Sequence, residues 1–140
     1  MKGILLCAIL TTTFFFGCKK DEATSPSQDQ FADKLTLGAG MSGFTIVGES
    51  ATFARLSGSA MVFWRLESAA DMGGSSVKIR IDKQGTGGYA PFDSVTYQNP
   101  QSYGHIMLSS FTMSSAGSFR ASGVLLSNGK SVASKDFSVN

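Results

Sequence analysis

Residues 31–140 are predicted to form an all-β domain. From Phe31 onward apolar residues recur at every second position, short turns rich in Gly and Ser separate the apolar segments, and no segment keeps the repeat of a helix. The clearest example sets three apolar residues against three charged ones, Val77, Ile79 and Ile81 against Lys78, Arg80 and Asp82. Because successive side chains of a strand point to opposite faces, this alternation predicts one buried side and one solvent-facing side.

Further segments along the chain carry the same strand pattern. In order, the segments are residues 35–37, 44–46, 51–56, 60–66, 77–82, 94–97, 105–113, 118–126 and 131–139. The last two are joined by Ser127-Asn128-Gly129-Lys130. Because Asn-Gly tolerates the positive φ angles of a tight type I′ turn, we expect an antiparallel hairpin there.

Residues 1–22 have the composition of an export signal. Lys2 supplies a positive start, an apolar run extends from Gly3 to Phe16, and Gly17 is a small residue before Cys18. The apolar run is about fifteen residues long, shorter than the roughly twenty that a membrane-spanning helix needs. We therefore expect residues 1–17 to be a signal peptide that is cut before Cys18.

The junction at Cys18 resembles the lipobox of bacterial lipoproteins, whose invariant cysteine follows a small residue. The resemblance implies that Cys18 receives diacylglyceryl and N-acyl groups of the palmitate type, and two or three such chains hold a protein durably on a membrane. Lys19-Lys20-Asp21-Glu22 also resembles the signal that sends some Gram-negative lipoproteins to the outer surface. The implied location is the bacterial envelope, at the surface or periplasmic face of the outer membrane.

Residues 18–30 are expected to form a flexible polar tether. They contain no large apolar side chain after Cys18 and cannot bury enough surface to become ordered. Fully extended, a dozen residues reach on the order of 40 Å. With Cys7 removed and Cys18 acylated, the domain has no thiol for a disulfide, so its stability must come from burial.

The second half of the domain resembles the E and F strands of immunoglobulin-like domains. In that family an apolar residue is followed by another two positions later, by a third three positions after that, and then by an Asp-x-Gly-x-Tyr-x-Cys run. The matching positions are Ile106, Leu108, Phe111, Ser115, Gly117, Phe119 and Ala121, with Ser, Phe and Ala replacing Asp, Tyr and Cys. Trp64 lies about where such domains bury a Trp on strand C. The resemblance implies an immunoglobulin-like antiparallel β-sandwich of about seven to nine strands, without the family's disulfide.

The motifs that could carry chemistry lack the required context. Gly38 to Gly43 match the dinucleotide pattern G-x-G-x-x-G, but β-branched and aromatic residues follow where a helix is required, so we expect a Gly-rich turn. The single imidazole, His105, has no local acid and is expected to be a surface or edge histidine. One His without a free Cys excludes the common zinc ligand sets. The carboxylates Glu67, Asp71, Asp82 and Asp93 match no calcium loop and are expected in solvated turns. We therefore expect no catalytic residue, metal or cofactor.

Two features are candidates for binding. Residues 89–105 hold four aromatic residues, Tyr89, Phe92, Tyr97 and Tyr103, which could form an interface or could only cover the edge of the sandwich. The second candidate follows if Trp64 points inward on strand C, beside strand F. Met61, Phe63 and Arg65 would then face outward next to Arg120 and Val124, unless a covering loop hides them.

These observations predict a membrane-anchored envelope lipoprotein whose domain is a non-catalytic binding, adhesion or assembly module. Its expected partners are the membrane, through the lipid anchor, and an envelope protein or polysaccharide. Nucleic acid is not expected, because the 12 Lys and Arg residues are scattered against 10 Asp and Glu residues. The first alternative is a carbohydrate-binding β-sandwich, which exposed rings in one plane would favour. The second is a hydrolytic enzyme, which a carboxylate pair about 5 to 10 Å apart would favour.

Overall fold

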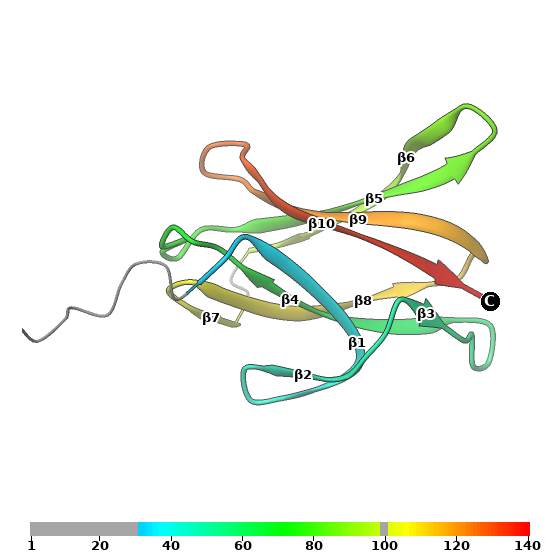
Figure 1. Ribbon diagram of the computed structural model, residues 1–140, viewed down its shortest axis with the longest axis horizontal. Coiled ribbons are helices and arrows are strands. Elements are labelled where there is room, and N and C mark those ends of the chain that lie inside the picture. Colours follow the sequence, from blue (N-terminus) through cyan, green and yellow to red (C-terminus); the bar gives the residue numbers. More distant parts are fainter. Residues whose placement is uncertain (1–30, 99–100) are drawn as a thin grey trace, which may run out of the picture.

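Two five-stranded sheets pack face to face in the computed structural model, which describes residues 31–98 and 101–140 (Figure 1). Residues 101–103 are described by their backbone alone. The first sheet, sheet A, has the strand order β2 (Thr45–Glu49), β1 (Lys34–Ser42), β4 (Ala60–Glu67), β8 (Ile106–Met113) and β7 (Gln101–Tyr103). The second, sheet B, has the order β3 (Thr52–Phe53), β10 (Ser131–Val139), β9 (Gly117–Leu125), β5 (Val77–Gly85) and β6 (Gly88–Tyr97).

The predicted all-β sandwich is confirmed. Every pair of neighbouring strands is antiparallel except β10 and β3, which are parallel. The orders β1-β4-β8-β7 and β10-β9-β5-β6 correspond to the A-B-E-D and G-F-C-C′ orders of immunoglobulin-like sandwiches. The described residues form ten strands, one more than the upper end of the prediction, because the three-residue strand β7 lacks a sequence pattern long enough to identify.

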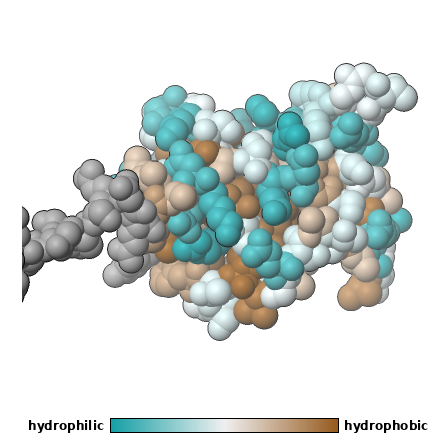
Figure 2. Space-filling view, viewed as in Figure 1, coloured by the Kyte–Doolittle hydropathy of each residue, from teal (hydrophilic) through white to brown (hydrophobic). Residues whose placement is uncertain are grey.

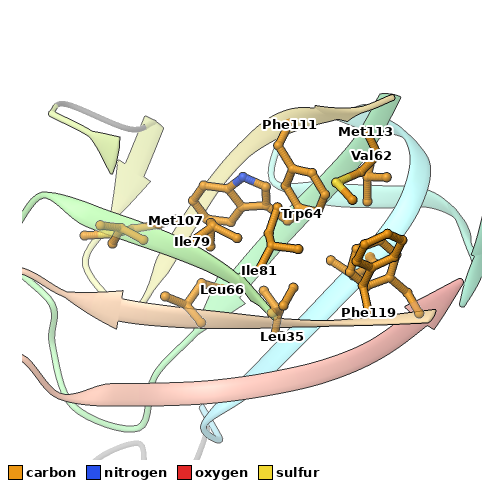
Figure 3. Packing of buried hydrophobic residues seen from close by; sticks show 14 of the residues in the cluster. Leu35, Val62, Trp64, Leu66, Ile79, Ile81, Met107, Phe111, Met113 and Phe119 are labelled. Atoms are coloured by element: carbon orange, nitrogen blue, oxygen red, sulfur yellow. The ribbon is translucent and has the colours of Figure 1, made fainter. Parts of the chain in front are cut away.

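The core lies between the sheets and is filled by alternating side chains. Trp64 and Phe119 are 0% exposed, so both are core residues as predicted. Figure 3 shows Trp64 beside Ile79, Ile81 and Phe111 in the middle of this cluster. The placement of Trp64 on strand C was wrong. Strand β4 pairs with β1 and β8 and therefore occupies the B position, whereas β5 is strand C.

Contact between the sheets is closest where Leu66 of β4 lies over Gly123 of β9. A Cβ atom at Gly123 would stand 2.6 Å from Leu66 Cδ1, so only a glycine fits there without a shift. Since inward residues recur with a period of two, Trp64 then lies level with Ala121, the position that the family fills with cysteine. An indole ring therefore occupies the part of the core where related domains place a disulfide.

The β9–β10 hairpin is confirmed, but its turn is not of type I′. Gly129 has a φ of 69°, whereas Asn128 has no positive φ, and five residues rather than two separate the strands. Gly129 N donates to Leu125 O at 2.8 Å, and Asn128 Oδ1 accepts a hydrogen bond from Lys130 N. The Asn side chain thus stabilises a wider loop around one left-handed glycine.

The type I′ geometry occurs instead at the turn before β4. Ser57 and Gly58 both have positive φ, of 54° and 91°, and Leu56 and Ser59 exchange two backbone hydrogen bonds. This turn leaves Leu56 78% exposed at one end of the molecule.

The Gly-rich segment from Gly38 to Gly43 forms the end of strand β1 and the first residue of a turn. Gly43, with a φ of 56°, opens a two-residue turn that leads into β2, as in a type II′ hairpin. A Cβ at Gly38 would stand 2.3 Å from Ile46 Cγ2, so Ile46 packs directly on the outward side of bare backbone. The expectation of a plain turn was therefore wrong for most of this segment. No membrane-spanning helix is present in the part of the chain that the structure describes.

Candidate functional site

The outer face of sheet B carries an ionic cluster made by three neighbouring strands. Arg120 of β9 lies directly opposite Asp136 of β10, and the guanidinium binds the carboxylate through Nε and Nη2 at 2.6 and 2.9 Å. The ring of Tyr89, from β6, lies 4.2 Å from the guanidinium on its other side. We call Tyr89, Arg120 and Asp136 the Arg120 cluster. Strand register brings these residues together from positions more than thirty residues apart at the extremes.

The charges of the Arg120 cluster hold one another in place. Hydrogen bonds from Arg120, with its positive charge, lower the pKa of Asp136. Partial burial, together with the nearby carboxylate of Asp136, raises the pKa of Tyr89. At neutral pH the cluster therefore presents an ionised carboxylate, a guanidinium and a neutral phenol.

The surface beside the cluster is polar and shallow. A depression of about 410 Å³ is lined by Ala51, Arg120, Ser134, Lys135 and Asp136. Ser134 also shares a hydrogen bond of 2.8 Å with Ser122. Such a surface can bind a polar partner through hydrogen bonds, but it does not enclose a small molecule.

The predicted aromatic segment does not form one cluster. Tyr97 packs edge-on against Trp64, with ring centroids 5.0 Å apart, and its hydroxyl donates to Ser110 O of sheet A at 2.7 Å. Burial raises the pKa of Tyr97, and the Trp64 indole partly offsets that rise. Trp64 Nε1 itself is buried without a partner in hydrogen-bonding geometry. Tyr97 therefore links the two sheets inside the sandwich.

Phe92 and Tyr89 lie elsewhere on the same strand. Phe92 covers the edge of the core at 5.3 Å from Phe119, and Lys83 Nζ lies over both rings, yet 42% of Phe92 remains exposed. Tyr89 belongs to the Arg120 cluster. The side chain of Tyr103 lies outside the described residues. Binding through Tyr89 or Phe92 stays a prediction.

The predicted face that joined Phe63 and Arg65 to Arg120 does not exist. Phe63 and Arg65 point outward from sheet A, whereas Arg120 points outward from sheet B, on the opposite side of the sandwich. The error follows from treating β4 as strand C. Arg65 forms an ion pair with Glu67 on its own strand, and Phe63 is half-buried.

The polar residues considered for catalysis or metal binding are engaged within the fold. His105 Nδ1 lies 2.9 Å from Ser68 O, and its ring stacks on Phe31 at 4.7 Å. Asp71 accepts a hydrogen bond from Gly73 N, as Asp93 does from Ser94 N. Asp82 is not in a solvated turn, because it lies within β5, is 7% exposed and accepts from Arg80 Nε at 3.1 Å. Within residues 31–98 and 101–140 no group of three or more metal-ligating side chains occurs.

An apolar surface on sheet A was missed by the sequence analysis. Most of the exposed large hydrophobic residues of the described chain come from the β1–β2 hairpin, the β3–β4 turn and the start of β4, namely Met41, Phe44, Val47, Leu56 and Met61. We call these five residues the apolar patch. Figure 2 shows apolar surface along the lower rim of the view, where Figure 1 places β2 and the β3–β4 turn. The unbroken β-branched run Thr45-Ile46-Val47 was the available signal, since it lacks polar alternation.

A groove adjoins the apolar patch between β1, β3 and β4. Its volume is about 480 Å³, and its lining residues include Ala39, Phe53, Leu56 and Met61. The molecule thus presents two surfaces of different chemistry, polar on sheet B and apolar on sheet A.

Comparison with known proteins adds no family to this description. No protein-family model matches the chain, and no curated protein matches it. Among solved structures, the chain is similar to the alkylpurine DNA glycosylase AlkC of Pseudomonas fluorescens, bound to DNA containing an abasic site analogue. The match has 14% identity and a TM-score of 0.36, and it covers 64% of this chain and 27% of that protein. A similarity of this size carries no argument about function, so the class defined by the fold is an all-β sandwich.

The carboxylates of this fold lead to a prediction about acid stability. The N–H of Ala69 is the main cause that lowers the pKa of Asp33, and Arg120 lowers that of Asp136. For Glu67 burial opposes the shift, but the Ala32 N–H and Arg65 outweigh it and lower the pKa. Because each folded-state pKa lies below the unfolded value of about 4, the ionised forms stabilise the fold above about pH 5, and this stability is lost as pH falls through the folded pKa.

Urea unfolding followed by circular dichroism checks this dependence. We expect the same midpoint at about pH 7 and pH 5 and a lower midpoint at about pH 3. Asp136→Asn should reduce the drop, whereas Asp93→Asn, whose carboxylate has no cationic partner among the described contacts, serves as the control. A midpoint that does not change with acid would contradict the assignment of these carboxylates as stabilising ions.

Proposed function

We propose that the chain is a lipid-anchored protein of the bacterial envelope, and that its β-sandwich is a non-catalytic binding, adhesion or assembly module. The observation that carries this proposal is the order of its parts. An apolar leader ends at Cys18, a polar segment of about a dozen residues follows, and the sandwich begins at Lys34. This order suits a domain that is held near a membrane and presents a surface to a partner.

The point where the chain enters the sandwich supports this arrangement. Asp33 accepts hydrogen bonds from Ser68 Oγ and Ala69 N at 3.1 and 2.9 Å, and its second oxygen lies 3.4 Å from Lys130 Nζ. These contacts fix the entry point at the end that carries the β4–β5 and β9–β10 loops (Figure 1). The β3–β4 turn, the β5–β6 hairpin and the C-terminus lie at the other end, which an anchored protein would direct away from the lipid.

The environment of the carboxyl groups favours binding over hydrolysis. A general acid in a glycosidase needs a raised pKa. Here the pKa values of Asp33, Glu67 and Asp136 are lowered by hydrogen bonds and cationic neighbours. These groups are suited to stay ionised, as structural or binding residues do.

The carbohydrate-binding alternative receives less support from the described rings. A planar platform needs several aromatic faces open to solvent. Trp64 is fully buried, Tyr97 is half-buried, and the face of Tyr89 packs on Arg120. The proposal is therefore a protein-binding or assembly module before a sugar-binding one.

Metabolic labelling with an alkynyl fatty acid tests the anchor. We expect label on the unmodified protein and its loss in Cys18→Ser, together with an uncut or mis-cut chain in the soluble fraction, because the acyl chains supply the membrane affinity. Cys7→Ser is the matched control and should keep both label and membrane location, since Cys7 lies within the predicted signal peptide. Label that persists on Cys18→Ser would sink the assignment of the lipid anchor.

A further inference from the structure

The four edge strands of the sandwich are not protected equally. Proteins normally block edge strands with Pro, bulges, inward charges or short length, because an open edge can pair with another chain. Strand β6 has Pro91, a register shift at Asp82 and the charge of Lys83 over its edge rings. Strands β3 and β7 are only two and three residues long. These three edges are therefore poor templates for a further strand.

Strand β2 has none of these protections. Its five residues, Thr45 to Glu49, contain no Pro or Lys and no register shift against β1, and Glu49 is its only charge. Four of the five residues are exposed, with Val47 at 52%. Across residues 31–98 and 101–140, no backbone hydrogen bond is made on the side of β2 away from β1. An open, β-branched edge thus lies within the apolar patch.

We propose that β2 pairs antiparallel with β2 of a second copy of this chain, about a two-fold axis at Val47. In this register the two Val47 side chains meet, and Thr45 of each copy faces Glu49 of the other. No like charges stand opposite each other, which favours the antiparallel arrangement because facing like charges destabilise a strand pair. The same surface serves both partners, as a two-fold interface requires.

The exposed area agrees with a second copy as the occupant. The five residues of the apolar patch expose about 500 Å² of side-chain surface, so covering the patch on two copies removes about 1,000 Å², near the lower limit for a specific interface. An interface of this size is weak in dilute solution. Two copies held on one membrane gain effective concentration without new contacts. This gain rests on the proposed lipid anchor, whereas the pairing itself does not.

Disulfide trapping of the full-length chain in the envelope of a Gram-negative host tests the register. In the proposed pair the Cβ atoms of the two Val47 residues are about 5 Å apart, within reach of a disulfide, whereas the two Thr45 positions are about 13 Å apart. After mild oxidation Val47→Cys should therefore form about tenfold more disulfide-linked dimer than Thr45→Cys alone. Thr45→Cys expressed together with Glu49→Cys should form the mixed dimer.

Two controls decide between this pairing and random collision. Leu126→Cys is 42% exposed at the other end of the sandwich and should give no more dimer than the unmodified chain. Equal trapping at Leu126 and Val47, or no trapping above the unmodified chain at Val47, would overturn the proposal. Dimers of the unmodified chain through Cys18 would instead count against the lipid anchor. Strong trapping through Thr45 alone would overturn the proposed register.

Discussion

Trp64→Ala is expected to lower the free energy of unfolding by about 3 to 5 kcal/mol, the largest effect of any single truncation considered for this chain. Trp64 is 0% exposed and lies between β5 and β9, with Tyr97 packed on its edge. The substitution removes the buried indole and leaves a cavity that the rigid strands cannot close. Tyr97 would also lose its ring contact, so the link between the sheets would weaken.

Urea unfolding followed by far-ultraviolet circular dichroism measures this loss, since the variant has no Trp to report by fluorescence. Met61→Ala is the matched control, because Met61 lies on the same strand, faces outward and is 57% exposed. Its effect should stay within about 0.5 kcal/mol. In the unmodified protein the single Trp should emit at short wavelength. A Trp64→Ala variant as stable as Met61→Ala would show that the indole does not lie in the core.

Gly123→Ala is expected to cost about 1 to 3 kcal/mol, although it adds only one methyl group. The new Cβ would stand 2.6 and 2.8 Å from the two Cδ atoms of Leu66, a residue with no exposed surface into which it could move. The sheets must therefore separate locally or Leu66 must leave its rotamer. Both responses reduce packing in the middle of the core.

A double-mutant cycle identifies the cause of that loss. Leu66→Val removes the clashing end of the side chain, so the double variant should be more stable than the sum of the single changes predicts. Gly74→Ala is the control, because nothing lies within 4 Å of its added Cβ and its φ is not positive. Strict additivity of Gly123→Ala and Leu66→Val would show that contact with Leu66 is not the cause.

The fold was predictable because burial repeats locally, whereas the surfaces depend on pairing between distant strands. Alternation along Val77 to Asp82 identified β5 and its inward side correctly. The same alternation placed Trp64 in the core but could not assign β4 to its sheet, since period two does not say which strand lies next to which. The outward face predicted around Phe63 and Arg120 failed for that reason.

The candidate surfaces required register and backbone conformation that the sequence does not carry. Arg120 and Asp136 meet because the β9–β10 register sets them opposite each other. The Asn-Gly signal at Asn128 correctly predicted a hairpin, but the turn length was decided by the hydrogen bonds of its closing residues. Two positive φ angles instead occur at Ser57 and Gly58, where the less distinctive Ser-Gly pair gave no comparable signal.

Opposite placement of the chain ends determines how this domain bears mechanical load. The tether enters beside Asp33 at one end, and at the other end Asn140 is held by backbone hydrogen bonds to Phe53 and Arg55. A pull between the membrane and a partner bound at the far end is therefore directed along the strands. Under such a pull the hydrogen bonds between β1 and β4 are loaded together in shear rather than opened one after another. The sandwich is oriented to transmit tension with its sheets intact.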